Sequence, residues 1–260
     1  MTMENNTILF EQRDGLAFLT LNRPEVRNAL NVQLQRELID VIEYVNMSED
    51  IKVVILTGAG DKAFAAGSDI SGMKDRTMLA VLNGIFAKAV TCLAECEKPV
   101  IAAVNGAAYG GGCELALAAD IRIASDTARF ALPETGLGIM PGGGGCRRLA
   151  TLIGMGRAKE MVFTGRSVGA EEALRIGLVT GVYPQEQLSA AVLALAEKIM
   201  EKGPFALRMA KKVLNLSQSV DEQSGRLLEL FSYCMLIASE DRVEGINAFL
   251  EKRKPDFKGR

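Results

Sequence analysis

KPVIAAVNGAAYGGGCELALAADIRIAS, residues 98–125, is the stretch that determines the fold class. From Pro99 to Ala119 it contains one charge, Glu114, in 21 residues, a length that would suit a membrane span. Its opening proline and the glycines at 106 and 110–112 are hard to fit into a single spanning helix. We therefore expect a buried strand over residues 99–105, a loop over 106–112 and a buried helix over 113–119.

Similar strand and helix patterns flank this segment on both sides. Residues 52–57, KVVILT, are a nearly continuous apolar run that is typical of a strand buried on both faces. The remaining predictions for the first half are a hairpin over 8–11 and 16–21, a helix that is N-capped by Asn31 and runs to about 45, a loop over 58–72, a helix to about 95, and strands over 121–124 and 129–132. This alternation predicts a mixed α/β core with parallel crossovers.

The C-terminal part has a different pattern. After about Arg147 the sequence becomes mainly helical, and residues 221–254 read as helices with an apolar face. A chain of 260 residues is ample for one domain with a full hydrophobic core. We therefore predict a core over residues 1–200 that carries the functional site, and a helical C-terminal region over 201–260.

The absence of one residue type restricts the chemistry. The chain contains no histidine, which excludes Ser-His-Asp and Cys-His catalysis, histidine general bases and histidine metal ligands. Acid/base chemistry near neutral pH must therefore come from carboxylates, Lys, Tyr or Cys with shifted pKa values.

The charge balance and the cysteines restrict the kinds of binding partner and the cellular compartment that we expect. The chain has 30 basic and 32 acidic residues, a formal net charge of −2, which argues against bulk electrostatic capture of nucleic acid or of anionic membranes. Its start, MTMENNTILFEQRDG, does not resemble a signal peptide. The five cysteines form no CxxC pair, so we expect apolar filling in a reducing cytoplasm and no zinc site.

Glu114 is the first candidate functional residue. It is the only charge between Lys98 and Asp120, and it lies just after three successive glycines that expose backbone N–H groups at a helix start. A lone carboxylate in an apolar helix is costly unless it is paired or protonated, and burial raises its pKa into a useful range for catalysis. Glu114 is therefore either an acid/base group, a cap of its own helix, or the partner of an arginine.

Glu134 is the second candidate, in FALPETGLGIMPGGGG, residues 130–145. It is the only charge between Arg129 and Arg147, within a loop rich in proline and glycine. A solvated surface glutamate is the plain interpretation. Two isolated carboxylates beside glycine-rich turns can also divide the work of taking and giving a proton.

The third segment is KAFAAGSDI, residues 62–70. Small residues before Gly67 would let a ligand lie against the main chain, and the N–H of Ser68 could donate to an oxyanion. The same small residues would also be expected in a tight loop between two elements, without any role in binding. The glycine runs do not form a dinucleotide fingerprint after a strand, nor a P-loop, so nucleotide binding of those types is not expected.

Taken together, these segments resemble the enoyl-CoA hydratase/isomerase (crotonase) superfamily over nearly the whole chain. The resemblance rests on LNRPEVRNALN (21–31), FAAGSDI (64–70), the segment 98–125, FALPETGLGIMPGGGG (130–145), GLVTGVYP (177–184) and the ending AFLEKRKPDF (248–257). It implies a ββα spiral core with C-terminal helices that support homotrimers or homohexamers. It also implies an acyl-CoA substrate and no cofactor beyond the coenzyme A carried by that substrate.

The resemblance assigns roles to individual positions. The N–H groups of Ser68 and Gly111 would hold the thioester oxygen. Glu114 would activate the water that adds at Cβ, and Glu134 would deliver the proton to Cα of a 2-enoyl-CoA. Residues expected to bind the acyl-CoA are Arg27, Ala66, Ser68, Asp69, Ile70, Ser71 and Gly111, with Arg27 at the nucleotide end.

Some positions depart from the usual pattern of the family. Ser68 replaces a frequent alanine, which leaves its backbone donor intact, and Ser71 replaces a frequent lysine. PGGGGCRRL stands for the usual PGAGGTQRL, so Cys146 and Arg147 are expected to reshape the wall behind Glu134 for an unusual acyl group. Cys113 is expected to serve packing.

The leading hypothesis is therefore a hydro-lyase that hydrates 2-enoyl-CoA or dehydrates 3-hydroxyacyl-CoA. One alternative is a Δ3,Δ2-enoyl-CoA isomerase, or another acyl-CoA enzyme of this fold. A protein of this fold that binds acyl-CoA or RNA without catalysis is a third, because Lys211-Lys212 and the basic end Lys252-Arg253-Lys254 could contact RNA.

Overall fold

The computed structural model describes residues 7–69, 74–75, 77–82, 84–217 and 219–260. Within them, one sheet has the strand order β1-β2-β3-β5-β7-β10 and a smaller sheet has the order β4-β6-β8-β9. The strands are β1 (Ile8–Arg13), β2 (Leu16–Leu21), β3 (Val53–Gly58), β4 (Ala63–Ala65), β5 (Val100–Val104), β6 (Ala107–Tyr109), β7 (Ile121–Ser125), β8 (Arg129–Ala131), β9 (Val168–Gly169) and β10 (Gly181–Tyr183).

The chain winds as a spiral between the two sheets. β3, β5 and β7 pair in parallel in the larger sheet, and the strand that follows each of them joins the smaller sheet. The helices are α1 (Val32–Met47), α2 (Met78–Leu82), α3 (Ile85–Ala94), α4 (Gly111–Ala118), α5 (Gly145–Ile153), α6 (Met155–Thr164), α7 (Ala170–Arg175), α8 (Leu188–Met200), α9 (Pro204–Leu216), α10 (Glu222–Ile237) and α11 (Glu240–Leu250). This repeat of strand, strand and helix is the ββα spiral that we expected.

The larger sheet is buried on both faces, as its apolar sequence predicts. Val54 and Leu56 of β3 point into the main core, which packs against helices such as α1 and α3. Val53 and Ile55 point to the opposite face, where Val192 and its neighbours on α8 cover them. Both faces of the sheet are thus packed, and short loops project from the ends of its strands.

Two predicted loops contain short strands instead. Residues 63–65 form β4 within the expected loop 58–72, and residues 107–109 form β6 within the expected loop 106–112. Three residues are too few to show strand alternation in sequence, and pairing between the two segments creates both strands. The helix after them begins at Gly111, two residues earlier than predicted.

The helix predicted up to residue 95 is interrupted. The described residues form two helices, α2 and α3, and Gly84 stands in extended conformation as the N-cap of α3. Beyond Arg147 the chain is mainly helical, as expected, but β9 and β10 add an edge strand to each sheet. The N-cap prediction at Asn31 is confirmed, since its side chain accepts the N–H of Leu34 at 2.8 Å.

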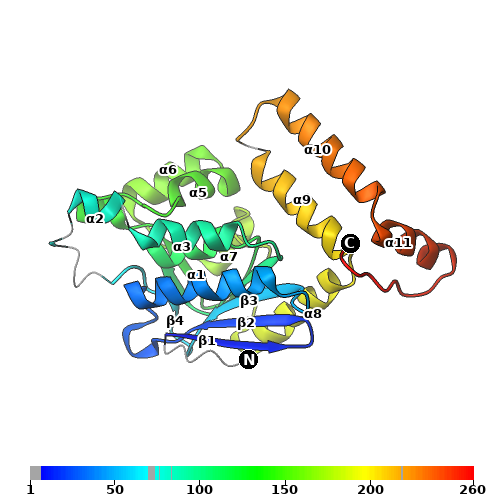
Figure 1. Cartoon of the computed structure of the whole chain (residues 1–260). Helices are drawn as coiled ribbons and strands as arrows, with labels where there is room; N and C mark the ends of the chain where they lie inside the picture. Colours follow the sequence, from blue (N-terminus) through cyan, green and yellow to red (C-terminus); the bar gives the residue numbers. More distant parts are fainter. Residues whose placement is uncertain (1–6, 70–73, 76, 83, 218) are drawn as a thin grey trace.

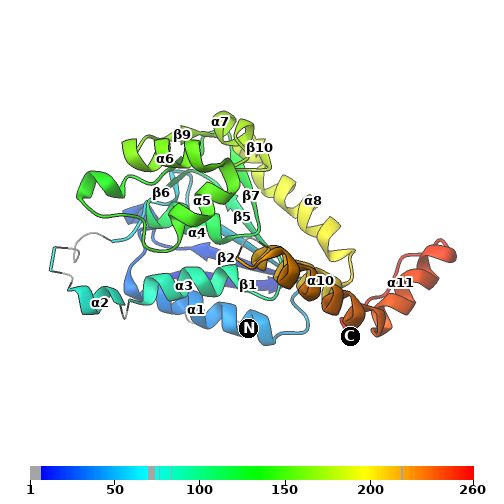
Figure 2. The same cartoon turned by 90° about the horizontal axis from the view of Figure 1, so that it is seen from above.

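Helices α9, α10 and α11 extend away from the body as an arm (Figure 1 and Figure 2). A half-buried ion pair links the base of the arm to the core, where Lys211 Nζ lies 2.7 Å from Asp120 Oδ2. None of the residues of α9 is buried, and of those in α10 only Ser232 is. The boundary at residue 200 stays a prediction, although the arm begins a few residues after it.

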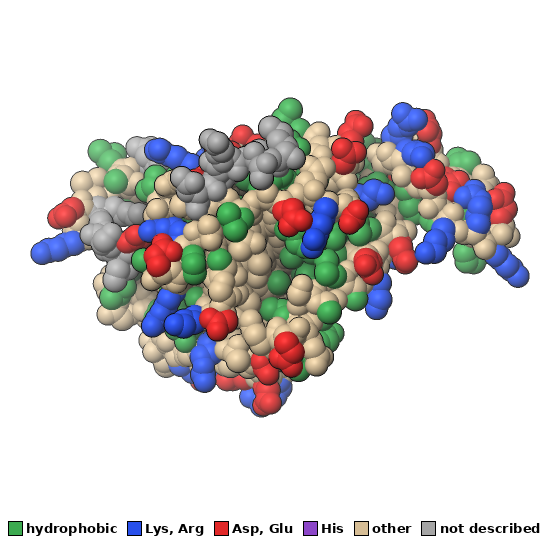
Figure 3. Space-filling view, turned by 90° about the horizontal axis from the view of Figure 1, so that it is seen from below, with side chains coloured by type: hydrophobic (Ala, Val, Ile, Leu, Met, Phe, Trp, Pro, Cys, Tyr) green, Lys and Arg blue, Asp and Glu red, His purple; other side chains and the backbone are tan. Residues whose placement is uncertain are grey.

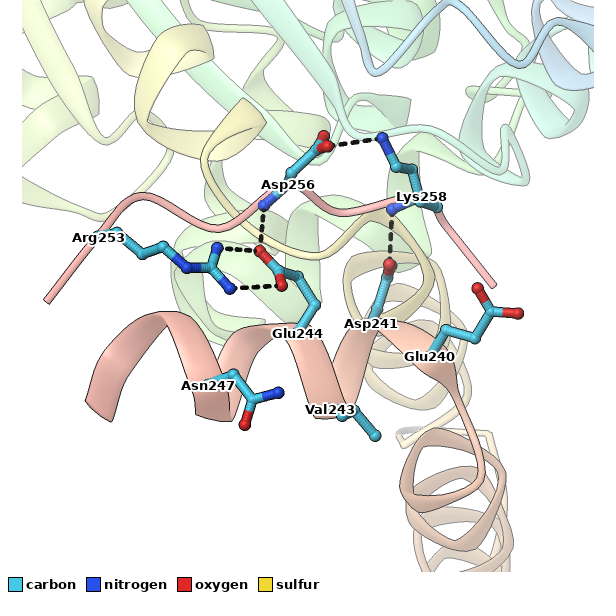
Figure 4. Close-up of a pocket in the computed structure, with 8 residues that line it drawn as sticks. All are labelled: Glu240, Asp241, Val243, Glu244, Asn247, Arg253, Asp256 and Lys258. Atoms are coloured by element: carbon cyan, nitrogen blue, oxygen red, sulfur yellow. Dashed lines mark hydrogen bonds and ion pairs between the residues drawn. The ribbon is translucent and has the colours of Figure 1, made fainter. Parts of the chain in front are cut away.

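The C-terminal segment folds back along α11 around an open hollow (Figure 4). Arg253 donates two hydrogen bonds to Glu244, at 2.6 and 2.8 Å, and the N–H of Asp256 donates to the same carboxylate. The N–H of Lys258 donates to Asp241 at 2.6 Å. These contacts anchor the end of the chain. No helix among the described residues has the length and apolarity needed to cross a membrane.

Candidate active site

The site begins where β6 runs directly into α4. Gly110 has a φ of +51°, a left-handed conformation that favours glycine, and α4 starts at the next residue. The side chain of Glu114 lies in the first turn of α4, and its residue is 1% exposed. Because the first N–H groups of a helix have no partner in that helix, the N–H of Gly111 is available as a donor at this point.

The loop after β4 lies beside this helix start. The N–H of Leu30 donates to Gly67 O at 2.8 Å, and Asp69 N–H donates to Leu30 O at 3.2 Å, so the N–H of Ser68 between them faces away from Leu30. A Cβ added to Gly111 would lie 2.9 Å from Ser68 Oγ. The structure therefore brings together Ser68 and Gly111, the two predicted oxyanion donors.

Glu114 is held by the glycine loop that precedes α5. Its Oε1 accepts the N–H groups of Gly143 and Gly145, both at 2.7 Å. Glu114 thus neither caps its own helix nor forms an ion pair within the described part of the chain. Burial raises its pKa, whereas these N–H groups and the charge of Arg148 act in the opposite direction and favour the ionised form.

Glu134 faces the same place from the other side. It begins a short 3-10 helix, Glu134–Leu137, and a Cβ added to Gly110 would lie 3.3 Å from its Oε1. Its Oε2 is buried and, among the described residues, has no hydrogen-bond partner. Burial raises the pKa of Glu134, and the negative charge of Glu114 raises it further. A fully solvated glutamate, the plain interpretation of the sequence, is therefore wrong.

The remaining predicted binding residues lie along one edge of the site. Arg27 is exposed, with a φ of +54°, and its carbonyl accepts the N–H of Ala66 at 2.9 Å. Asp69 lies 3.7 Å from Arg23 in an ion pair. Arg27, Ala66 and Asp69 therefore lie next to the oxyanion donors in a continuous strip of surface. Ile70 and Ser71, also predicted to bind substrate, lie outside the described residues.

The cysteines have different surroundings. Cys113 is fully buried in the core, as predicted, and burial raises its pKa strongly. Cys146 is half-buried, and its pKa is raised by burial and then by the charges of Glu114 and Glu134. It therefore lies near both carboxylates, where the sequence places it. Cys234 is exposed on α10, so the expectation that all the cysteines fill apolar space is wrong there.

Two residues of the site were not predicted. Arg148 donates to the carbonyl of Gly143 at 2.6 Å and so fixes the loop that holds Glu114. The Phe86 ring lies against both Gly111 and Gly143, because a Cβ on either glycine would come within 3.0 Å or less of it. The sequence gives no signal for Phe86, since an aromatic residue at a helix start usually belongs to the core. Arg148 could have been suspected from its place just after the glycine run.

This arrangement can stabilise an oxyanion while two carboxylates exchange protons with the neighbouring carbon atoms. Two backbone donors lie side by side at one end. A buried, hydrogen-bonded glutamate and a second glutamate with an unpartnered oxygen lie at the other.

Comparisons with known proteins point to the same chemistry. The family model for enoyl-CoA hydratase/isomerase matches residues 11–260. The chain is 44% identical to a short-chain-enoyl-CoA hydratase of Clostridium acetobutylicum, over 99% of this chain and 100% of that one. It is 43% identical to a crotonyl-CoA hydratase of Syntrophomonas wolfei, over 99% of both chains. The crystal structure of an enoyl-CoA hydratase from Bacillus anthracis superimposes with a TM-score of 0.94 at 40% identity, covering 98% of this chain and 100% of that chain. With a matching family model along almost its entire length and relatives of this similarity, the chain belongs to the enoyl-CoA hydratase/isomerase family and has its crotonase-like fold.

Proposed function

We propose that this protein is an enoyl-CoA hydratase that adds water across the 2,3 double bond of a 2-enoyl-CoA and catalyses the reverse dehydration. The names of the relatives at 43–44% identity support this activity. The observation that carries the proposal is the pair Glu114 and Glu134, beside the Ser68–Gly111 donors, in a chain without histidine.

The two glutamates differ in a way that suits hydration. Burial raises the pKa of both carboxyl groups. At Glu114 two backbone N–H groups counteract that rise and favour the carboxylate, whereas Glu134 has a buried oxygen without a partner among the described residues and a negative neighbour, which both favour its protonated form. Glu114 would therefore take a proton from a water molecule as the oxygen of that water bonds to C3. Glu134 would give its proton to C2. Proton exchange with solvent would then deprotonate Glu114 and reprotonate Glu134 before the next turnover.

The backbone donors would act on the thioester. As C3 gains the hydroxyl group, electron density moves from the double bond to the thioester oxygen, and the N–H groups of Ser68 and Gly111 would stabilise that negative charge. Removing one donor of this type typically costs about 10²–10³ in rate. Arg27, Ala66 and Asp69 would line the path of the CoA. Beyond the CoA of its substrate, the reaction needs no cofactor.

The test is loss of the conjugated enoyl-thioester absorbance of crotonyl-CoA, with Glu114→Gln and Glu134→Gln as variants and Glu197→Gln as the matched control. Glu197 is exposed on α8, which covers the far face of the sheet. We expect turnover by the wild type and the control, and a loss of at least about 10³-fold in each active-site variant. Full activity in either of those variants would contradict the proposal.

An isomerase would use the same fold with one glutamate shuttling a proton between carbon atoms. Deuterium incorporation at C4 as a 3-enoyl-CoA is converted to the 2-enoyl-CoA, without net hydration, would identify that activity instead. RNA binding has less support. On the face shown in Figure 3, basic and acidic side chains are interspersed, in keeping with the net charge of −2.

We propose further that copies of this chain assemble through the arm, as a homotrimer or a pair of trimers. The arm exposes large apolar side chains, among them Leu230, Phe231, Phe249 and Leu250, with Phe249 83% exposed. A helix of this kind obtains most of its stability from burying its apolar face, and extended apolar patches of this kind mark interaction sites. A second copy presents the same surface, and symmetric self-association is the common way to cover it.

Light scattering after size exclusion tests this assembly. We expect a mass near three or six times 27.9 kDa for the wild type, and smaller species for Phe231→Glu and Phe249→Glu. Phe163→Glu, exposed on α6 outside the arm, is the control. A monomeric wild type would refute the proposal.

The five cysteines are all unpaired in the described structure, which suits a reducing compartment, so we propose a cytoplasmic location.

A further inference from the structure

The Phe86 ring contacts both halves of the candidate active site. A Cβ added to Gly111 would lie 3.0 Å from its Cζ, and one added to Gly143 would lie 2.8 Å from its Cε1 and 3.2 Å from its Cζ. The tip of the ring thus contacts both the backbone that offers the oxyanion donor and the backbone that holds Glu114. Only hydrogen atoms on the two glycines leave room for the ring at this place.

Helix α3 holds the ring in this position. Ala89, Val90 and Leu93 of the same helix are fully buried in the main core, and α3 packs against α1 and α4. Phe86 itself is only half-buried, although it packs against the same core. A phenyl ring has two rotatable side-chain bonds, so with its helix anchored it can leave this place only by changing its rotamer. The partly accessible part of the ring is therefore a fixed apolar surface beside the reacting groups.

We propose that Phe86 forms the end wall of the acyl pocket and restricts the substrate to short acyl chains. This inference rests on the proposed hydratase function. With the thioester oxygen at Gly111 and C3 beside Glu114, the carbon atoms beyond C3 run toward the space that the ring occupies. A four-carbon chain ends before the ring, whereas each further methylene must displace it or turn away.

Chain-length preference separates this role from a merely structural one. Loss of core packing lowers the activity toward all acyl lengths together, whereas an open end wall changes their ratio. One methylene that gains or loses its place in an apolar pocket changes kcat/KM by about 10-fold or more. Replacing the ring by a methyl group frees space for several methylenes, so we expect a change in the ratio of at least about 10².

The experiment compares kcat/KM for crotonyl-CoA and 2-decenoyl-CoA in the wild type, Phe86→Ala and Phe86→Leu. Ile85→Ala is the matched control, because Ile85 packs against the same core while the atoms nearest to Gly111 and Gly143 belong to Phe86, Ser68 and Glu114. We expect the decenoyl-to-crotonyl ratio to rise about 10²-fold in Phe86→Ala, less in Phe86→Leu, and not in Ile85→Ala. An unchanged ratio in both Phe86 variants, or an equal change in the control, would overturn the inference.

Binding of unreactive acyl-CoAs separates failure of this inference from failure of the proposed function. Isothermal titration with butyryl-CoA and decanoyl-CoA requires no turnover. Tighter binding of decanoyl-CoA by Phe86→Ala than by wild type, with butyryl-CoA little changed, supports the end wall even if no hydration is detected. If the wild type hydrates crotonyl-CoA but already binds decanoyl-CoA as tightly as the variant does, the inference fails and the proposed function stands.

Discussion

Substituting Gly145 by alanine tests whether the glycine loop positions Glu114, the proposed catalytic base. The added Cβ would lie 2.8 Å from Oε1 and 2.9 Å from Cγ of Glu114. Ordinary contact begins near 3.4 Å, so the carboxylate must move by roughly 0.6 Å. The movement also weakens the 2.7 Å hydrogen bond from the Gly145 N–H.

The expected cost follows from these two effects. A hydrogen bond to a charged group contributes about 1.5–3 kcal/mol, equivalent to roughly 10- to 150-fold in rate. Misplacement of a reacting group by about 1 Å costs about 10²-fold. We therefore expect kcat for crotonyl-CoA to fall about 10²-fold, with little change in KM, because the oxyanion donors and the CoA path are untouched.

The pH profile provides a second readout. Glu114 must be ionised to act as a base, so activity is present above its pKa and is lost as the pH falls through it. Burial already raises this pKa, and the N–H groups counteract the rise. Weakening one of them raises the pKa further, so the acidic limb of kcat/KM should move to higher pH.

The control is Gly156→Ala, in the first turn of α6, where an added Cβ meets no atom within 4 Å. It should leave kcat unchanged and stabilise the fold by up to about 1 kcal/mol. The reasoning would be refuted if Gly145→Ala kept kcat within about twofold of the wild type, or if its acidic limb did not move while circular dichroism showed a native fold.

Three further predictions concern stability. Glu134→Gln should raise the midpoint of thermal unfolding by a few degrees at pH 8 and less at pH 4. The folded state holds this proton more tightly than the unfolded chain, so the cost of ionising Glu134 is absent below its pKa in the unfolded chain and is complete above its raised pKa in the folded state. An equal gain at both pH values would exclude this cause. Lys211→Met should lower the free energy of unfolding in urea by about 3 kcal/mol, because Asp120 loses its ion-pair partner. Adding Asp120→Asn should recover most of this loss, and additive losses in the double variant would contradict a coupled pair. Gly112→Ala should prevent native folding at 37 °C, because the new Cβ would overlap the carbonyl oxygen of Ala65, and a native melting curve would show that β4 can move aside.

Much of the spiral is readable in the sequence because its strands are buried on both faces. Val53, Val54, Ile55 and Leu56 are all buried in the structure, and an apolar run of this kind leaves little choice of secondary structure. Likewise, the N-cap at Asn31 is predictable because it depends only on Asn31 and on the N–H of Leu34, three residues along the chain. The short strands β4 and β6 were missed because they form by pairing with each other and, for β6, with β8, which the local sequence does not encode.

The candidate site likewise has features that the sequence predicts and features that only the structure shows. Glu114 and Glu134 stand out in the sequence as lone charges among apolar and glycine residues, and their isolation is a local property. The division of labour between them is not local. It depends on which carboxylate receives the N–H groups of Gly143 and Gly145, and those residues lie about 30 positions further along the chain.

The sequence alone therefore determined the strand and helix alternation, the exclusion of histidine chemistry, and the identity of the two carboxylates, because each follows from residue type and near neighbours. Only the tertiary structure decided that Ser68 lies beside Gly111, that Glu134 keeps a buried oxygen without a partner among the described residues, and that the Phe86 ring lies against Gly111 and Gly143. The physical reason is that hydrogen bonding, desolvation and steric contact act between atoms that are close in space, and chain folding alone brings those atoms together.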